Sequence, residues 1–409
     1  MKKLYLFFLT PLFLYSQNLE QLVNLSIQNK LVDSSLKSLD SIKDEYKSVK
    51  SGYLPSLDVG AGHSIADNET PAIARNSSKA YASLNYVLYD GGKKYDIYDA
   101  YESTIKSADA SVLALKNDIA LNVINNYYNY LSNISQKEAK IKEIEQLDSQ
   151  LQRLSRFLDA GTTTEDEVQK LISRLENAKV VLQEIELNMQ TIIHNLEYIV
   201  GEEINIESGS FIQELQNDEE RDLRFDLKST QFDLQTKLSN SKSEKSTYLP
   251  TITLDNTYSY YDNRYSGDFE SNNPDHQNIL SANLKWNLFS FGKTKYKYES
   301  KYKDYLSEKS RFEYEKNKSD TDLKLAVKAY DISKLKIKSS EANLKAANLA
   351  YEVIKSKYEN GLIDNVAFLE SLSEKFDALS QVKTSQNQLE IKKANILYHS
   401  GKKLQEYIK

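Results

Sequence analysis

Hydrophobic and polar residues alternate in four short stretches of the chain. In residues 280–288 the even positions are apolar and the odd positions are polar or charged, and residues 80–88 also carry apolar side chains at the even positions. Residues 57–65 and 251–260 alternate in the same way. A period of two predicts a β-strand with one apolar and one polar face. Strands of about ten residues are also long enough to cross a bilayer.

Apolar residues three and four positions apart predict helices elsewhere. This spacing continues through residues 144–158 and 168–199, which predicts a coiled-coil seam. No proline lies between Pro71 and Pro250 or after Pro274, so very long helices can form there. In the C-terminal half the corresponding series is interrupted by Ser371, Lys375, Ser385 and Lys392. We interpret this interruption as a helix face turned toward water.

The predicted helices have matching lengths. Residues 93–158 would form a helix of roughly 100 Å at the usual rise per residue. Residues 19–52 and 164–199 would each form a helix of roughly 50 Å. Stacked end to end, the two shorter helices could lie alongside the long one. The sequence therefore predicts a mostly α-helical fold with a small β part.

The chain is an internal duplication. The phrase YLPSLDV at 53–59 returns as YLPTITL at 248–254, and ASLNYVLYDGGK at 82–93 returns as ANLKWNLFSFGK at 282–293. Two copies are too few for a solenoid, so we expect pseudo-symmetry within one fold. We assign the first copy to residues 17–200, a linker or equatorial segment to 201–215 and the second copy to 216–409.

The N-terminus predicts export. Lys2 and Lys3 precede an apolar run over residues 4–15, which is too short for a membrane-spanning helix and is typical of a secretory signal peptide over residues 1–16. The chain has no cysteine, so the sequence provides no disulfide, no thiolate metal site and no lipid-acceptor cysteine.

Composition and motifs argue against several functions. The 53 basic and 59 acidic residues are mixed along the chain, with no basic patch that would indicate nucleic acid binding. Gly292-Lys293-Thr294 ends like a phosphate-binding loop, but Asn287 stands where that motif needs its other glycine. We therefore expect no catalytic residues, no cofactor and no metal, because no metal-spaced pair occurs among His63, His194, His276 and His399.

Over essentially its whole mature length the chain resembles the TolC family of outer-membrane efflux proteins. The resemblance rests on the duplicated YLP segments, the corners LYDGGKK and LFSFGKT, and the turns FLDAGTTTEDEV and YENGLIDNVAFLES. It implies a homotrimer in the outer membrane of a Gram-negative bacterium. Each protomer would add four strands to one 12-stranded β-barrel, and the helices would form a periplasmic tunnel.

The resemblance also implies a function and partners. The chain would be the exit channel of a tripartite efflux or type I secretion system. It would work with a periplasmic adaptor (membrane fusion) protein, an inner-membrane transporter of the RND, ABC or MFS type, and outer-membrane lipid.

Two helix turns are the expected adaptor-docking tips, formed by Gly161 with Thr162 and by Gly361 with Leu362. Each glycine is expected to end a helix in the left-handed conformation. We expect Thr164 and Glu167 to form a capping box at the next helix, and Asp364 to be the N-cap of its counterpart.

The resemblance makes Glu370 a candidate pore constriction, where three-fold symmetry would bring three carboxylates together, with Tyr358 and Glu167 nearby. The alternative is a solvated glutamate on a helix surface. The chain departs from a common family pattern at Ala367, which replaces an acid, and at Ile363, which replaces an arginine. The contacts that hold the closed state must therefore differ from those of the common family pattern.

Gly91, Gly92 and Gly292 are the expected strand-to-helix corners. The aromatic residues near these corners are Tyr86, Tyr89, Trp286 and Phe289. Their side chains suit either an interfacial membrane belt or ordinary sheet packing. One alternative reading of the chain is a secreted periplasmic coiled-coil scaffold whose strands form a small soluble sheet.

Overall fold

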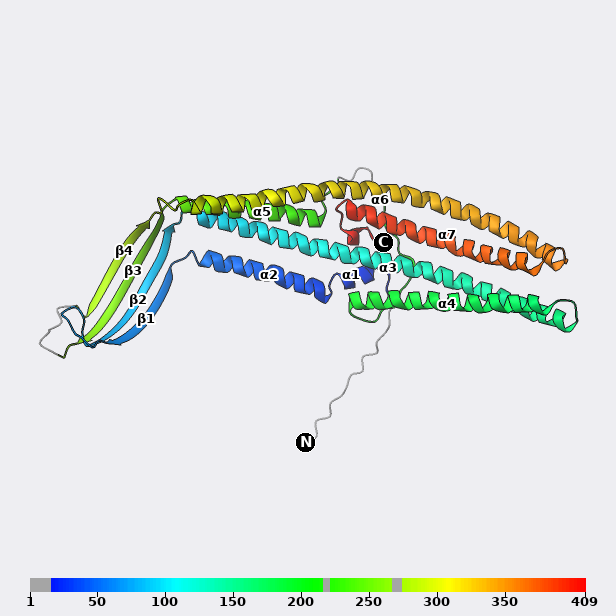
Figure 1. Cartoon of the computed structure of the whole chain (residues 1–409), viewed down its shortest axis with the longest axis horizontal. Coiled ribbons are helices and arrows are strands. Elements are labelled where there is room, and N and C mark those ends of the chain that lie inside the picture. The colour runs from blue at the N-terminus through cyan, green and yellow to red at the C-terminus, as the bar shows by residue number, and fades with distance from the viewer. Residues whose placement is uncertain (1–15, 216–220, 267–273) are drawn as a thin grey trace, which may run out of the picture. The chain divides into compact units, whose positions relative to one another are not determined.

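The computed structural model describes residues 16–215, 221–266 and 274–409. The predicted signal peptide falls almost entirely outside these ranges, as does the start of the second copy. The elements in chain order are α1 (Leu19–Ser26), α2 (Lys30–Ser51), β1 (Ser56–Ile65), β2 (Asn76–Tyr89), α3 (Lys93–Asp159), α4 (Glu165–Val200), α5 (Phe225–Lys245), η1 (Ser246–Tyr248), β3 (Thr251–Arg264), β4 (His276–Lys285), α6 (Lys293–Glu359), α7 (Asn365–His399) and η2 (Leu404–Tyr407) (Figure 1).

The chain divides into two compact units, and α3 and α6 each contribute to both. One unit, here the strand unit, holds residues 35–111 and 226–316. The other, the hairpin unit, holds residues 1–34, 112–225 and 317–409.

The strand unit contains one antiparallel sheet of order β1-β2-β3-β4. Its register pairs Leu57 with Leu84 and Leu254 with Ala282, so the apolar positions of all four strands share one face. That face is exposed, with Val59 78% and Leu280 69% accessible. The predicted four strands with one apolar face are therefore confirmed.

The predicted last strand is too long. It was expected to continue to residue 288, but β4 ends at Lys285. The indole Nε1 of Trp286 donates a hydrogen bond of 3.0 Å to the carbonyl of Tyr248. The backbone pairing ends at Thr251 and Lys285, and residues 286–292 lead on to α6.

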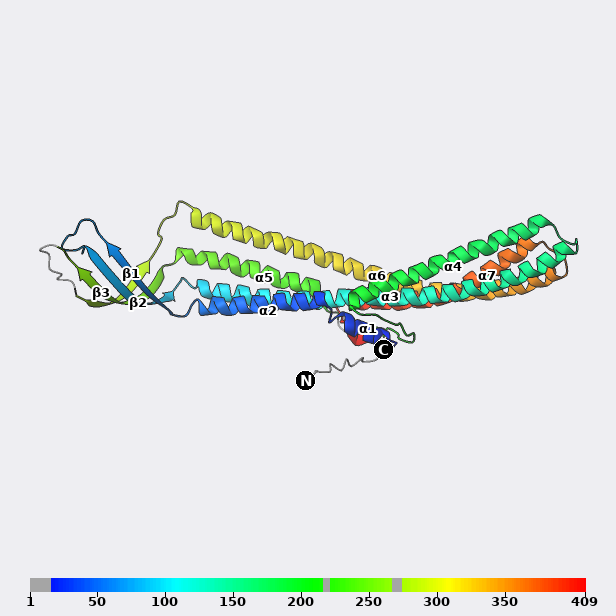
Figure 2. The same ribbon diagram turned by 90° about the horizontal axis from the view of Figure 1, so that it is seen from below.

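The helices of the strand unit pack through small and aromatic residues. Figures 1 and 2 both show α2 and α5 beside the first part of α3. Tyr46 of α2 stacks on Tyr101 of α3 with ring centroids 5.8 Å apart, and its hydroxyl donates to Glu102 at 2.8 Å. On the α5 side, the hydroxyls of Ser107 and Ser229 lie 2.9 Å apart. These short side chains let the helix backbones approach closely.

The hairpin unit has one core where α1 and η2 meet the segment after α4. Tyr127 and Tyr128 of α3 are almost fully buried, and their hydroxyls donate to the carbonyls of Glu207 and Ser210 at 2.8 and 3.1 Å. Burying these hydroxyls without partners would be costly, so the bonds fix residues 201–215 against α3. Ile212 adds a bridge to Ile408.

The predicted helix over residues 19–52 is wrong, because the structure breaks it into α1 and α2. Asn29 accepts a hydrogen bond from the backbone N–H of Val32 at 3.0 Å, which caps the start of α2. Its side-chain amide donates to the carbonyl of Ile199 at 3.0 Å. The Asn29 side chain thus starts α2 and attaches it to the end of α4.

The second core of the hairpin unit confirms the predicted seam between α3 and α4. Buried apolar residues from both helices meet in one cluster, including Leu147, Leu154, Val168, Leu171, Leu175 and Ala178. The interpretation of the corresponding C-terminal series as a water-facing side is wrong at two positions, since Ser371 and Ser385 are 3% and 4% exposed. Ser371 satisfies its hydroxyl by donating to the carbonyl of Phe368 at 2.8 Å.

Among the described residues, none of the helices combines the length and apolar character that crossing a membrane would require.

Candidate functional site

Two helix turns at the ends of the hairpins have the same backbone geometry. Gly161 and Gly361 both adopt φ of 70°. Gly161 donates to the carbonyl of Leu158 and Thr162 to that of Phe157, while Gly361 and Leu362 repeat this pair of bonds in the second hairpin. The pattern is the Schellman motif, which satisfies the last carbonyls of the helix. The left-handed conformation predicted for both glycines is confirmed, and Leu362 lies 72% exposed beside it.

The helices that follow the two turns begin differently. Asp364 accepts a hydrogen bond from the backbone N–H of Ala367 at 2.9 Å, so the predicted N-cap is confirmed. The predicted capping box at Thr164 is wrong, because that hydroxyl makes no cap bond and donates instead to Asp166. Glu167 accepts from Thr163 at 2.7 Å, which takes its carboxylate away from the N-cap backbone.

Tyr358 lies at a junction of all four hairpin helices. Its ring stacks on Phe368 of α7 with centroids 4.7 Å apart and planes 14° apart. The guanidinium of Arg153 on α3 lies 5.9 Å from the same ring. Burial raises the pKa of the Tyr358 hydroxyl, an effect that Arg153 opposes and the Glu167 carboxylate on α4 reinforces. The Glu167 carboxylate therefore lies close enough to influence the Tyr358 hydroxyl, while its own hydrogen bond is to Thr163.

Arg153 is the residue that the sequence reasoning missed at this junction. The family arginine is expected two residues after Gly361, where the chain has Ile363. Instead a cation reaches the junction from α3, where Arg153 also lies 5.3 Å from the ring of Phe157. An arginine four residues before an aromatic residue on a predicted helix is the signal that could have indicated it.

Glu370 lies apart from this junction within the single chain. It is exposed on α7, and it forms no ion pair with another described residue. The preceding residues Phe368 and Leu369 are 0% and 8% exposed, so the α7 backbone carrying Glu370 is held firmly against the core. The structure therefore presents the Glu370 carboxylate to solvent from a fixed helix.

The strand-to-helix connections of the strand unit both use the left-handed region at two successive residues. Gly91 and Gly92 have φ of 75° and 82° between β2 and α3. Phe291 and Gly292 have φ of 51° and 85° before α6. A Cβ at Gly91 would lie 2.6 Å from the carbonyl oxygen of Ser246, whereas one at Gly92 would meet open space. Gly91 is therefore required by packing as well as by backbone conformation.

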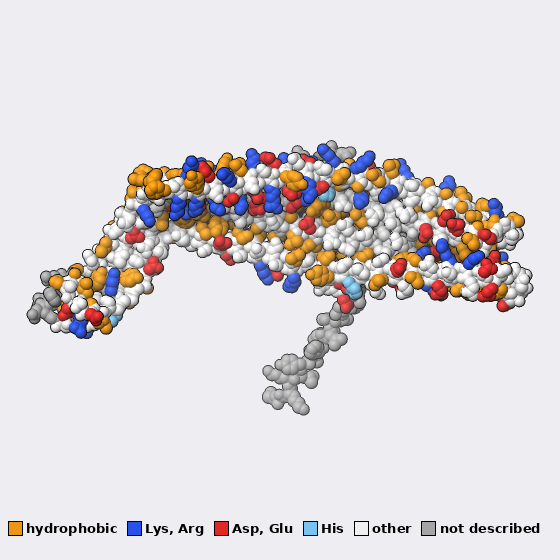
Figure 3. Space-filling view, in the orientation of Figure 1, with side chains coloured by type: hydrophobic (Ala, Val, Ile, Leu, Met, Phe, Trp, Pro, Cys, Tyr) orange, Lys and Arg blue, Asp and Glu red, His pale blue; other side chains and the backbone are white. Residues whose placement is uncertain are grey.

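Aromatic and apolar side chains gather in the open where β4 connects to α6 (Figure 3). Phe289 and Phe291 are 72% and 89% exposed, and their rings contact each other edge to face at 4.5 Å. Trp286 and Tyr89 are 53% and 40% exposed. Exposure in the single chain fits an interfacial belt at Tyr89, Trp286 and Phe289, whereas the half-buried Tyr86 of β2 also fits sheet packing, and the belt stays a prediction.

The described residues lack the ligand set of a metal site. They contain no group of three or more His, Cys, Asp or Glu side chains that could hold a metal ion.

A four-stranded sheet with an exposed apolar face, joined to long helical hairpins, defines a class of outer-membrane channel proteins. The chain matches the sequence model of the family described as "Outer membrane efflux protein" over residues 22–202 and 218–401. It belongs to this family. It is therefore an outer-membrane transport channel and not an enzyme, and the predicted family and fold class are confirmed.

Solved structures share the fold at low sequence identity. A membrane protein from Pseudomonas aeruginosa is 16% identical, with a TM-score of 0.83 and coverage of 94% of this chain and 93% of that one. The outer membrane protein VceC of Vibrio cholerae is 14% identical, with a TM-score of 0.82 and coverage of 94% and 96%. The CmeC outer membrane channel of Campylobacter jejuni is 16% identical, with a TM-score of 0.81 and coverage of 94% and 85%. No curated protein matches the chain significantly.

Proposed function

We propose that three copies of the chain form the exit channel of a tripartite efflux or type I secretion system. The observation that carries this proposal is the sheet. Its apolar face is exposed, and within the described residues β1 and β4 each pair with a single neighbour. An unpaired strand edge is not viable in lipid, so the sheet needs further strands to close. Three copies supply a 12-stranded barrel with apolar residues toward lipid and polar residues toward a water-filled lumen.

The two hairpin turns are the proposed contact with a periplasmic adaptor. Thr162 and Leu362 follow the left-handed glycines Gly161 and Gly361, and Leu362 leaves its side chain in solvent. An exposed apolar side chain on a rigid turn suits a partner that buries it. The energy source would be an inner-membrane transporter of the RND, ABC or MFS type, which the adaptor connects to this channel.

The constriction is the proposed role of Glu370, with Tyr358 and Glu167 in the supporting junction. Three-fold symmetry would place three Glu370 carboxylates around one axis, which favours cations. The Tyr358 ring contacts Phe368 and Arg153 across three of the hairpin helices, with the Glu167 carboxylate of α4 near it, so we propose this junction as the latch of the closed state. Opening would separate α7 from the helices that carry Arg153 and Glu167.

Fractionation followed by particle mass tests the assembly. We expect the protein in the outer-membrane fraction, and a detergent-extracted particle of three chains of 46.9 kDa each before removal of any leader. A soluble periplasmic monomer would instead favour the coiled-coil scaffold.

Conductance tests the constriction. Glu370→Ala should reduce cation preference in bilayer recordings, measured as a reversal potential in a salt gradient. Glu184→Ala removes an exposed glutamate from α4 and serves as the matched control. Equal shifts of the reversal potential in both variants would contradict a specific role of Glu370 in the constriction.

A further inference from the structure

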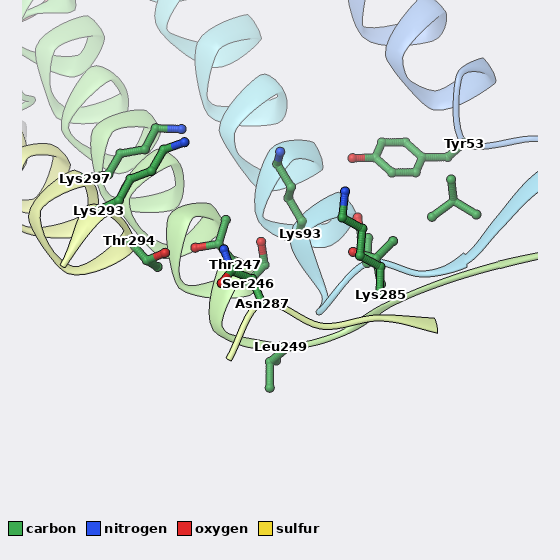
Figure 4. Close-up of a pocket in the computed structure, with 13 residues that line it drawn as sticks. Tyr53, Lys93, Ser246, Thr247, Leu249, Lys285, Asn287, Lys293, Thr294 and Lys297 are labelled. Atoms are coloured by element: carbon green, nitrogen blue, oxygen red, sulfur yellow. The ribbon is translucent and has the colours of Figure 1, made fainter. Parts of the chain in front are cut away.

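A cationic pocket lies on the strand unit where β4 leads to α6. Its volume is about 570 Å³, and four of the residues that line it are Lys93, Lys285, Lys293 and Lys297. They come from three elements, since Lys93 opens α3, Lys285 ends β4 and the other two lie in the first turns of α6. Figure 4 shows their ammonium groups extending into the same opening, with Thr247 and Asn287 between them.

The positive charge in this pocket is only partly compensated. Within the described residues Lys93, Lys285 and Lys293 form no ion pair, while Lys297 lies 3.1 Å from Glu244. Asp90 also lines the pocket, and its carboxylate accepts the backbone N–H of Lys94 at 2.8 Å. The first turn of α6 carries no acidic residue, so its lysines add to the positive end of the helix dipole.

The duplication indicates that part of this charge is specific to the second copy, since Lys93 and Lys293 are equivalent residues of the two copies. Residues 90–99 carry three acids and two lysines, whereas the equivalent residues 290–299 carry one acid and three lysines. On the preceding strand Lys285 takes the place of Asn85. The two corners therefore share the lysine at 93 and 293, and the second corner carries the greater positive charge.

The register places Lys285, the one strand residue among the four lysines, on the polar face of the sheet. Lys285 pairs with Thr251, and it shares a face with Asn283 and Asp255, which are hydrogen bonded to each other at 2.9 Å. Leu284, 64% exposed, points to the opposite, apolar face. In a barrel whose apolar face meets lipid, Lys285 would face the lumen, and the pocket that it lines with the three helix lysines would open to the same side. This step rests on the proposed function.

We propose that this pocket binds multivalent oxyanions, with phosphate-bearing molecules as the ligand class. Several mobile ammonium groups around one opening suit a small ligand with several charged oxygens, and lysine binds phosphate as a point charge without fixed geometry. Thr247 and Asn287 supply polar side chains beside the lysines. Three copies bring three such pockets to one level of the lumen, where they concentrate passing anions.

Tripolyphosphate is the probe for this site. Added to single channels in a planar bilayer, it should block the current of the parent protein. The variant Lys93→Gln/Lys285→Gln/Lys293→Gln should raise the half-blocking concentration by about tenfold, a change of 1.4 kcal/mol. The control Lys295→Gln/Lys301→Gln/Lys303→Gln removes the same charge from α6 outside the pocket, and its half-blocking concentration should change less than about twofold. Equal shifts in the two triple variants, or a parent channel that tripolyphosphate does not block, would overturn the proposal.

Two further measurements separate this proposal from its assumptions. If neither the parent nor the variants conduct, the proposed channel function fails. Calorimetric binding of tripolyphosphate to the detergent-solubilised parent then still tests the pocket. If phospholipid phosphate purifies with the parent but not with the pocket variant, and tripolyphosphate does not block, the ligand is a lipid headgroup and the luminal site is wrong.

Discussion

The two strand-to-helix corners show how a duplicated unit keeps its backbone while its surface diverges. Both corners pass through the left-handed region at two successive residues. In the first corner Gly91 packs against Ser246 and Leu249. In the second corner Phe291 occupies the equivalent position, 89% exposed, with left-handed φ that non-glycine residues rarely adopt. The backbone path is thus the retained property, and aromatic and basic side chains are what the second corner adds.

The hairpin tips give the same lesson on a smaller scale. Their Schellman turns match bond for bond, yet only Asp364 caps the helix that follows. The halves of the molecule therefore differ in packing and charge at positions where their backbones agree. Replacing a residue of one copy by its equivalent in the other is a direct way to test what each difference does.

The largest expected effect is at the packed corner. Gly91→Ala combines left-handed strain of about 1–2 kcal/mol with overpacking of about 1–3 kcal/mol. The adjacent Gly92→Ala should cost only the strain, since a Cβ there meets open space. Thermal unfolding of the solubilised protein checks the pair, and equal midpoints for the two variants would show that the contact with Ser246 does not matter.

A smaller effect distinguishes the two tips. Asp364→Ala removes a side-chain N-cap and should destabilise the protein by about 1 kcal/mol. Thr164→Ala removes a hydroxyl that makes no cap bond, so its unfolding midpoint should stay near that of the parent. A larger loss for Thr164→Ala than for Asp364→Ala would contradict the assignment of the caps.

The smallest effect depends on pH. Although Asp377 reaches solvent, partial burial between helices raises the pKa of its carboxyl, Glu143 adds to this, and Lys140 and Arg174 oppose it. The first copy has Asn177 at the equivalent position. Below the usual aspartate pKa of about 3.9 the group is protonated in both folded and unfolded chains and has no effect. As the pH rises through the raised pKa, the folded state must hold a partly desolvated charge, so the free energy of unfolding falls.

Asp377→Asn should therefore stabilise the protein at pH 7 by roughly 0.5 kcal/mol, a modest value because solvent screens the group. The gain should vanish as the pH approaches 4. Unfolding midpoints of parent and variant across this range provide the check, and a gain that grows at low pH would have the wrong sign.

The long helices and the strand faces could be predicted because they follow from local periodicity. The positions of Gly161, Gly361 and Asp364 were equally predictable, since turn and cap chemistry is local. The break at Asn29 was not, because it depends on a bond to Ile199 far along the chain. Arg153 and the lysine pocket escaped prediction for a similar reason, since each site gathers side chains from helices and strands distant in sequence.

Ion conductance of the purified protein in a planar bilayer tests the central claim most directly. If three sheets close into one barrel continuous with a helical tunnel, the protein should produce discrete current steps of uniform size that scale with salt concentration. A pure three-chain particle that enters the bilayer and passes no current under any applied voltage or salt would contradict the channel.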